Sequence, residues 1–251
     1  MQENLPCFQA FRNNSLAFLI FRKNVQVIIG ENNTRFTTKP SYVKLLYLEG
    51  RKMEIIMDPI NLLAAINLFV TLSANYSGAK RGLKTSITKV IERPETFLQK
   101  IPPNVAALVL VLTILSIFKI GTMPVEFEQK YQTLRIIGLL LFILFSWLQI
   151  TSYKALGNNY AQDIVIIKGH NLVTKGVYRF IRHPQYLSQM LSDLGAGLAL
   201  MSYLVIPLVL LVEIPLLIMR AIAEEKMLSR HFGNEHLDYK KRSGFIIPFI
   251  G

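Results

Sequence analysis

The sequence predicts an all-α integral membrane protein, a helical bundle of about five transmembrane helices. Of its 251 residues 51% are apolar, and the mean hydropathy is +0.36. Several apolar runs approach the roughly 20 residues that a helix needs to cross a bilayer. The net charge of +12 is also typical of nucleic-acid-binding proteins. In so apolar a chain, basic residues in cytoplasmic loops explain the charge better, and we expect no nucleic-acid partner.

Three apolar runs are the first predicted transmembrane helices. Loops rich in charged residues separate them, and Trp147 and Tyr153 near the end of the third run fit aromatic anchors at a membrane interface. The runs cover residues 59–76, 104–120 and 136–153.

The next apolar stretch, residues 187–219, is too long for one span. As a single helix it would measure roughly 50 Å at 1.5 Å per residue, against a hydrocarbon core of about 30 Å. Gly195, Gly197 and the Met201–Ser202 region offer a break, so we predict two shorter helices packed as a hairpin. Asp193 and Glu213 lie inside this stretch and are expected to face protein or water rather than lipid.

The loop charges predict the orientation. Residues 77–103, residues 154–185 and the C-terminus are basic, whereas residues 121–132 are acidic. Five spans place all the basic loops on the cytoplasmic side. We therefore expect a multi-pass membrane protein with a cytosolic C-terminal helix.

Residues 1–52 do not follow this pattern. They carry eight Lys or Arg and three acidic residues, and their short apolar cluster does not resemble a signal peptide. We expect a poorly structured extension. With five spans this segment falls on the outer side of the membrane, although its basic residues favour the cytoplasmic side. Without residues 1–52 the net charge falls from +12 to +7. We hypothesise that the natural start is Met53 or Met57, with residues 53–155 forming spans one to three.

Cysteine and histidine usage predicts no metal site. Cys7 is the single cysteine, so the sequence has no internal disulfide framework. The four histidines are scattered without the short spacing of zinc ligands.

Two polar blocks, residues 169–186 and 220–239, interrupt or follow the apolar runs. We predict that they meet at a membrane face and form the functional site. Arg220 and Glu224 share one helix face at i, i+4; they are either a solvated ion pair or two groups with separate ligands. His231 and His236 are expected on the surface.

A series of short motifs runs from residue 156 to residue 250. It consists of LGNNY (156–160), GHNLVTKGVY (169–178), RHPQY (182–186), EE (224–225), HFGNEHLDYKKR (231–242) and IPF (247–249). In order and spacing this series resembles the isoprenylcysteine carboxyl methyltransferase family, within the membrane-embedded phospholipid and isoprenylcysteine methyltransferases. The layout is similar to that of the short prokaryotic members with five spans. Residues 156–251 would then be the methyltransferase core.

The resemblance implies S-adenosylmethionine as the methyl donor, in a cytosol-facing pocket capped by the C-terminal helix. It places Arg220 at the methyl acceptor and Glu224 at the donor, as the two catalytic positions. A family glutamine falls near Gln162, but the spacing differs by about one residue, so we do not assign it. The implied donor-binding residues are His170, Asn171, Leu172, Val173, Tyr178, His183, Pro184, Gln185, Tyr186 and Glu224.

The chemistry favours a carboxylate acceptor, as in an isoprenylcysteine-like lipid. A carboxylate is already ionised and needs no general base, and a guanidinium such as that of Arg220 binds it well. The alternative is a phospholipid amine N-methyltransferase, but an amine acceptor would need a general base. A non-enzymatic small membrane protein is the third hypothesis, and the chain is too short for a sterol reductase. The expected partners are a prenylated acceptor and the bilayer; the oligomeric state stays open.

Overall fold

The computed structural model describes residues 43–48, 51–88, 90–248 and 250, and the chain divides into two compact units, Met1–Pro59 and Ile60–Gly251. In the first unit, strands β1 (Val43–Leu48) and β2 (Arg51–Met57) form an antiparallel hairpin. The sequence predicts little structure over residues 1–52. Most of that segment lies outside the described residues, and its described part belongs to this hairpin, which no sequence pattern predicted.

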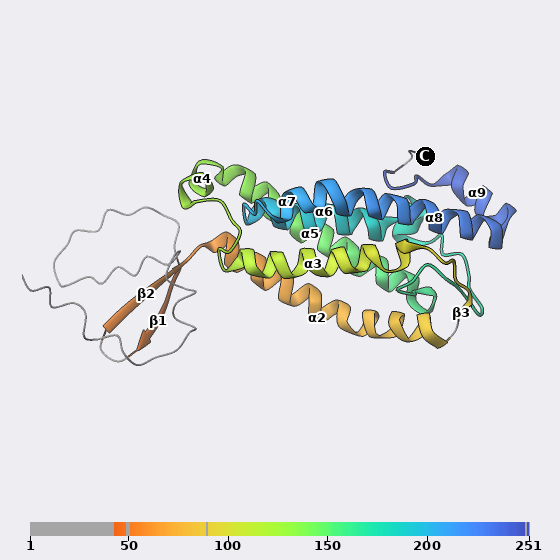
Figure 1. The fold of residues 1–251 in the computed structure, drawn as a ribbon, viewed down its shortest axis with the longest axis horizontal. Coiled ribbons are helices and arrows are strands. Elements are labelled where there is room, and N and C mark those ends of the chain that lie inside the picture. Colours follow the sequence, from red (N-terminus) through yellow and green to blue (C-terminus); the bar gives the residue numbers. More distant parts are fainter. Residues whose placement is uncertain (1–42, 49–50, 89, 249, 251) are drawn as a thin grey trace, which may run out of the picture. The chain divides into compact units, whose positions relative to one another are not determined.

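The second unit is a bundle of long helices joined by short helical turns and one small sheet (Figure 1). In Figure 1, α2, α3, α5, α6 and α8 run lengthwise, with α4 and α7 at one end and α9 and β3 at the other. The α-helices are α2 (Pro59–Thr88), α3 (Ile101–Ile117), α4 (Val125–Lys130), α5 (Gln132–Leu156), α6 (Pro184–Ala199), α7 (Val205–Leu208), α8 (Ile214–Phe232) and α9 (Asn234–Arg242). Strands β3 (Val90–Glu92) and β4 (Ile166–Ile167) pair antiparallel, and shorter helical turns cover Phe97–Gln99, Gly157–Asn159, Gly176–Arg179 and Val209–Glu213.

Within the described residues, four helical segments are long and apolar enough to cross a membrane. They are Pro59–Tyr76, Phe97–Ile117, Gln132–Leu156 and Val205–Phe232. Helix α6 has 16 residues and falls short of that length. The mostly helical membrane architecture therefore matches the sequence-based expectation, whereas the count of five spans stays a prediction.

The apolar stretch of residues 187–219 breaks where the sequence predicts. Helix α6 ends at Ala199, and the chain turns through Met201, which has a positive φ of 50°. The returning helix contains a π turn, Val209–Glu213, directly before Pro215. Because proline has no N–H and its ring crowds the preceding turn, regular α-helical bonding is interrupted there.

Helices α5 and α6 form the closest packing in the bundle, because glycines let their backbones approach. A Cβ on Gly138 would lie 2.5 Å from the backbone nitrogen of Ala199, and one on Gly195 would lie 2.5 Å from that of Phe142. Leu139 and Phe142 pack there with Ala196 and Leu200 of the α6 end. This packing fixes α6, whose first turns carry several of the predicted site residues.

Candidate functional site

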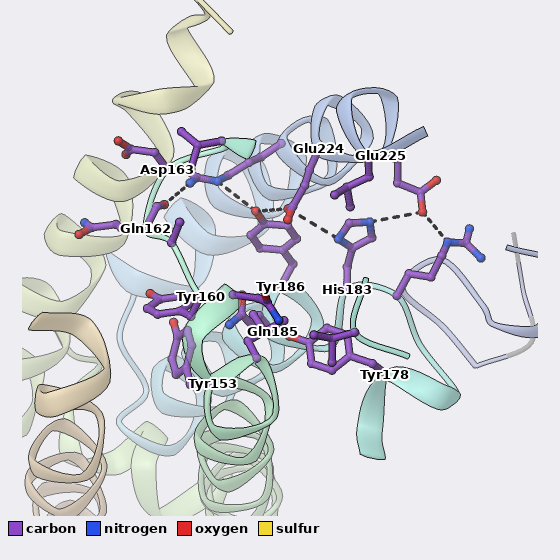
Figure 2. A pocket seen from close by; sticks show the side chains of 18 of the residues that line it. Tyr153, Tyr160, Gln162, Asp163, Tyr178, His183, Gln185, Tyr186, Glu224 and Glu225 are labelled. Atoms are coloured by element: carbon purple, nitrogen blue, oxygen red, sulfur yellow. Dashed lines mark hydrogen bonds and ion pairs between the residues drawn. The ribbon is translucent and has the colours of Figure 1, made fainter. Parts of the chain in front are cut away.

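A cavity of about 310 Å³ lies at the end of the bundle where α8 meets α9 (Figure 2). Its walls come from the start of α3, the end of α5, the segment between α5 and α6, and helices α6, α8 and α9. The predicted site residues that line it are His170, Asn171, Leu172, Val173, Tyr178, His183, Gln185, Tyr186, Arg220 and Glu224. The exception is Pro184, which is buried at the first turn of α6 and starts that helix. The structure thus brings the two polar blocks together around one space.

Arg220 is anchored at the side of the cavity that faces α3. Its side chain donates to the carbonyl oxygens of Leu98 at 3.0 Å and Gln162 at 2.5 Å, and its Nε donates to the Tyr186 hydroxyl at 3.1 Å. A guanidinium has five N–H donors, so these three bonds leave one N–H on each terminal nitrogen. Arg220 is therefore held in place, while two of its donors have no partner among the described residues.

The Tyr186 hydroxyl joins Arg220 to Glu224. It accepts from Arg220 and donates to Glu224 Oε2 at 2.8 Å. Because Tyr186 stands between them, the surface ion pair considered from their i, i+4 spacing is replaced by a bridged arrangement. The Glu224 side chain is 33% exposed and reaches the cavity, so its carboxylate is accessible to a ligand.

His183 lies between the two adjacent glutamates (Figure 2). Its Nδ1 is 3.9 Å from Glu224 Oε2, and its Nε2 is 3.5 Å from Glu225 Oε1. The ring stacks on Tyr186 with centroids 5.6 Å apart and meets Phe245 edge-on. His183 is thus held by packing from both sides, at the start of α6.

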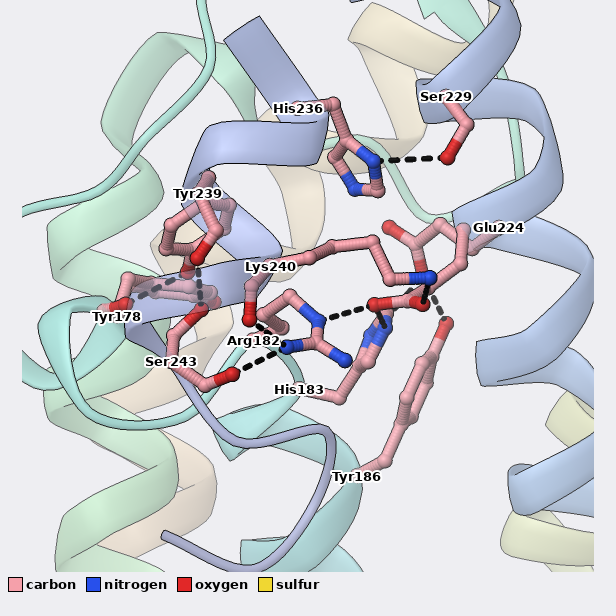
Figure 3. Close-up of polar contacts among 11 residues, drawn as sticks. Tyr178, Arg182, His183, Tyr186, Glu224, Ser229, His236, Tyr239, Lys240 and Ser243 are labelled. Atoms are coloured by element: carbon pink, nitrogen blue, oxygen red, sulfur yellow. Dashed lines mark hydrogen bonds and ion pairs between the residues drawn. The ribbon is translucent and has the colours of Figure 1, made fainter. Parts of the chain in front are cut away.

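Glu225 pairs with two cations, Arg182 and Lys240, whose side chains Figure 3 shows. Its Oε1 accepts from Arg182 Nε, and its Oε2 is 3.0 Å from Lys240 Nζ. Arg182 also donates to the carbonyl oxygens of Lys240 and Ser243. This ion-pair cluster fastens α9 and the following segment to α8 and to the start of α6.

Further bonds hold α9 over the cavity. The Tyr239 hydroxyl donates to the carbonyl oxygen of Tyr178 at 2.6 Å, and burial raises the Tyr239 pKa to about 12, so this hydroxyl stays protonated. His236 Nδ1 lies 2.8 Å from Ser229 Oγ. The expectation that His236 lies on the surface is wrong: it is 1% exposed, because α9 folds back on α8 after Gly233, whose φ is 52°. His231 is exposed, as the sequence predicts.

The segment around His170 forms another part of the cavity wall. The Asn171 backbone N–H donates to Asn159 Oδ1 at 3.2 Å, and the His170 ring meets Phe232 edge-on at 5.6 Å. Burial lowers the pKa of His170 and raises that of Tyr178 well above its usual value, so both side chains are neutral at pH 7.

Several buried polar atoms of the cavity residues have no hydrogen-bond partner within the described part of the chain. These atoms are His170 Nδ1, Tyr178 OH and Gln185 Nε2. A buried polar atom without a partner costs about 1–3 kcal/mol. Their gathering around one cavity indicates that a polar ligand supplies the missing partners.

Other cavity residues were not assigned from the sequence. Gln162 was not assigned to the site because its spacing from the motif differs by about one residue. In the structure Gln162 lines the cavity, and its carbonyl oxygen accepts a hydrogen bond from Arg220. The remaining lining side chains that no prediction assigned to the site include Tyr153, Tyr160, Asp163, Arg182, Gln189, Glu225 and Tyr239. Cavity residues within long helices are hard to predict from the sequence. Whether such a polar residue faces the cavity depends on where the neighbouring helix packs.

Comparisons with known proteins agree with this geometry. Residues 133–235 match the family model described as phospholipid methyltransferase. This segment contains every predicted site residue. Most of the residues that line the cavity lie within this matched segment.

The chain is similar to protein-S-isoprenylcysteine O-methyltransferases. The enzyme of Tribolium castaneum is 35% identical over 116 residues, which cover 45% of this chain and 41% of that protein. The enzyme of Saccharomyces cerevisiae is 32% identical, with 46% and 49% covered, and that of Homo sapiens is 31% identical, with 47% and 42% covered. The matched segment thus spans less than half the length of these relatives.

A solved structure shares the fold. It is that of the eukaryotic intramembrane Ras methyltransferase, isoprenylcysteine carboxyl methyltransferase. The match has a TM-score of 0.53 and 25% sequence identity, and it covers 76% of this chain and 68% of that one. The resemblance noted from the motifs is confirmed by these relatives and by this fold.

Proposed function

We propose that this protein transfers a methyl group from S-adenosylmethionine to the carboxylate of an isoprenylcysteine-like lipid. One observation carries the proposal: Arg220 and Glu224, of opposite charge, face the same cavity and are linked by the Tyr186 hydroxyl. A carboxylate and a cationic group can each find a partner of opposite charge there. The relatives' names point to the same reaction.

The donor fits the side of the cavity near α9. Glu224 would accept from the donor's amino group, since a charge-assisted bond of this kind is short and strong. The buried atoms without partners, Tyr178 OH and Gln185 Nε2 among them, would bond the polar parts of the donor. His170, Asn171, Leu172 and Val173 would complete this wall. We assign these residues to donor binding.

The carboxylate of the acceptor would bind the Arg220 guanidinium. Its two uncommitted N–H groups can hold a carboxylate, and the carbonyl oxygens of Leu98 and Gln162 keep the guanidinium from rotating. The apolar side chains of Ala106 and Leu217 line the cavity and suit a hydrocarbon chain. A lipidated acceptor would enter between the helices, while the donor would come from the cytosol.

The reaction needs alignment more than acid–base chemistry. When bound, S-adenosylmethionine supplies a methyl group that the carboxylate oxygen takes by displacement, with the electron pair of the broken bond staying on sulfur. No proton is released, so the chain's own residues have to position two charged ligands and exclude water. Tyr186 serves this purpose by fixing Arg220 relative to Glu224.

A phospholipid amine N-methyltransferase is the second candidate, because the matching family model carries that description. An amine acceptor must lose a proton, and a guanidinium is a poor base for it. Methyl transfer to farnesylcysteine but not to phosphatidylethanolamine supports the carboxylate reaction, and the reverse result supports the amine reaction.

The decisive experiment is binding of S-adenosylhomocysteine to detergent-purified protein by calorimetry, with Glu224→Ala as the matched variant. We expect micromolar binding by the wild type and a large loss in the variant. Arg220→Ala should keep this binding and lose methyl transfer. A folded wild-type protein that binds no donor or product would support the non-enzymatic hypothesis instead.

A further inference from the structure

A second polar group lies deeper in the bundle and takes no part in the reaction described above. Glu213 is 1% exposed and sits on the π turn of the membrane-spanning helix. Asp193 of α6 lies close to it. A buried acidic side chain within a membrane span is costly and usually marks a functional position, and π turns within helices are frequent at such positions.

Glu213 orients Gln189, which lines the cavity. The Gln189 Nε2 donates to Glu213 Oε1 at 2.8 Å. In this bond the amide nitrogen of Gln189 faces the Glu213 carboxyl group. The carbonyl oxygen of Gln189 is then left for the cavity, and in the described part of the chain no group donates to it.

The position of Gln189 relates it to the acceptor site. It lies three residues after Tyr186 on α6, and Tyr186 contacts Arg220 directly. Glu213, at the end of the π turn that leads into α8, precedes Arg220 by seven residues, or about 10 Å along the helix. Gln189 and Arg220 line the same cavity, so a ligand whose carboxylate is held by Arg220 and whose chain runs into the bundle would pass near Gln189.

We propose that Gln189 determines acceptor specificity by accepting a hydrogen bond from an N–H group next to the acceptor's carboxylate. The site would then favour an N-acylated, S-prenylated amino acid over a prenylated acid that lacks the amide. This inference rests on the proposed function and adds that the site recognises the acceptor's amide N–H group. Glu213 acts on the acceptor through Gln189 and is a positioning residue.

Two acceptors that differ in this one group test the proposal. N-acetyl-S-farnesylcysteine carries the amide, whereas S-farnesylthiopropionic acid has the same carboxylate, thioether and prenyl chain without it. For each we would measure kcat/KM, and Kd by calorimetry in the presence of S-adenosylhomocysteine. We expect the wild type to prefer the amide-bearing acceptor about tenfold in both quantities, the effect of one good hydrogen bond.

Gln189→Met keeps the length of the side chain and removes the carbonyl oxygen. It should bring the ratio of the two acceptors to about one, mainly by weakening the amide-bearing acceptor. Gln189→Leu is a second variant with the same expected ratio, and Gln132→Met, at an exposed position, should keep the wild-type preference.

Each outcome is decisive. Equal use of the two acceptors by the wild type, or an unchanged preference in a folded Gln189→Met protein, overturns the role of Gln189 while methyl transfer itself stands. Transfer to neither acceptor by the wild type overturns the proposed function, and this inference with it.

Discussion

Glu224 and Glu225 are adjacent in sequence, but the structure gives them different environments, so their substitution should have different consequences. Glu225 is paired with Arg182 and Lys240 and is buried. Glu224 is 33% exposed at the cavity and accepts one bond from Tyr186. We expect Glu225→Gln to unfold more easily than the wild type and Glu224→Gln to lose donor affinity with little loss of stability.

The magnitudes follow from the partners that each variant leaves behind. Glu225→Gln leaves the Arg182 guanidinium, 3% exposed, without its carboxylate, and breaking a buried ion pair costs about 3–5 kcal/mol. Because Arg182 keeps two carbonyl acceptors, we place the loss near the lower figure. In Glu224→Gln the new amide oxygen can still accept from Tyr186, so the loss should stay within about 1 kcal/mol.

The assay is denaturant unfolding in mild detergent, combined with amide hydrogen exchange over residues 234–242. Faster amide exchange in α9 of Glu225→Gln would show that the lost stability comes from weaker attachment of α9 to α8. Binding of S-adenosylhomocysteine to Glu224→Gln should weaken at least tenfold, since a charged partner is lost. A Glu225→Gln protein as stable as the wild type would refute the reasoning, as would a Glu224→Gln protein less stable than it.

Three further predictions concern other parts of the bundle. Tyr186→Phe removes the bridge between Arg220 and Glu224, and we expect kcat/KM for methyl transfer to fall about 10–100-fold, as for loss of hydrogen bonds to charged groups. Gly195→Val should destabilise the protein by about 1–3 kcal/mol or more through overpacking, measured by thermal unfolding, whereas Gly78→Ala, with open space around it, should not. Burial holds the pKa of His236 below its usual value of about 6.5, so the unfolded chain takes up a proton there first as the pH falls. Its contribution to stability is therefore complete above about pH 6.5 and declines below it, and His236→Asn should flatten that part of the unfolding profile.

The sequence predicts the parts of the fold that depend on hydropathy and local breaks. The first span coincides with Pro59–Tyr76, and the turn at Met201–Ser202 falls where small and polar residues interrupt a long apolar stretch. The two polar blocks converge because the helices that carry them pack together. Their place near the ends of apolar runs was enough to predict this.

Other features depend on contacts between distant segments, which the pattern does not reveal. His236 and Tyr239 are polar residues in a charged helix, and nothing local shows that they face inward. Gln189 occurs within an apolar run, where its role depends on Glu213 of another helix. Glu224 and Glu225 are chemically identical, and only the rotation of α8 decides which of them meets the cations of α9.

The backbone of the segment that starts α6 is completed by residues from the end of the described chain. The N–H groups of Arg182 and His183 donate to the carbonyl oxygens of Gly244 and Phe245, and the Gly244 N–H donates to Phe180. During synthesis, the helices can insert and pack long before this pairing is possible. The cavity therefore acquires its final shape only after residues 244 and 245 have left the ribosome, so a shorter nascent chain cannot yet offer a ligand the complete site.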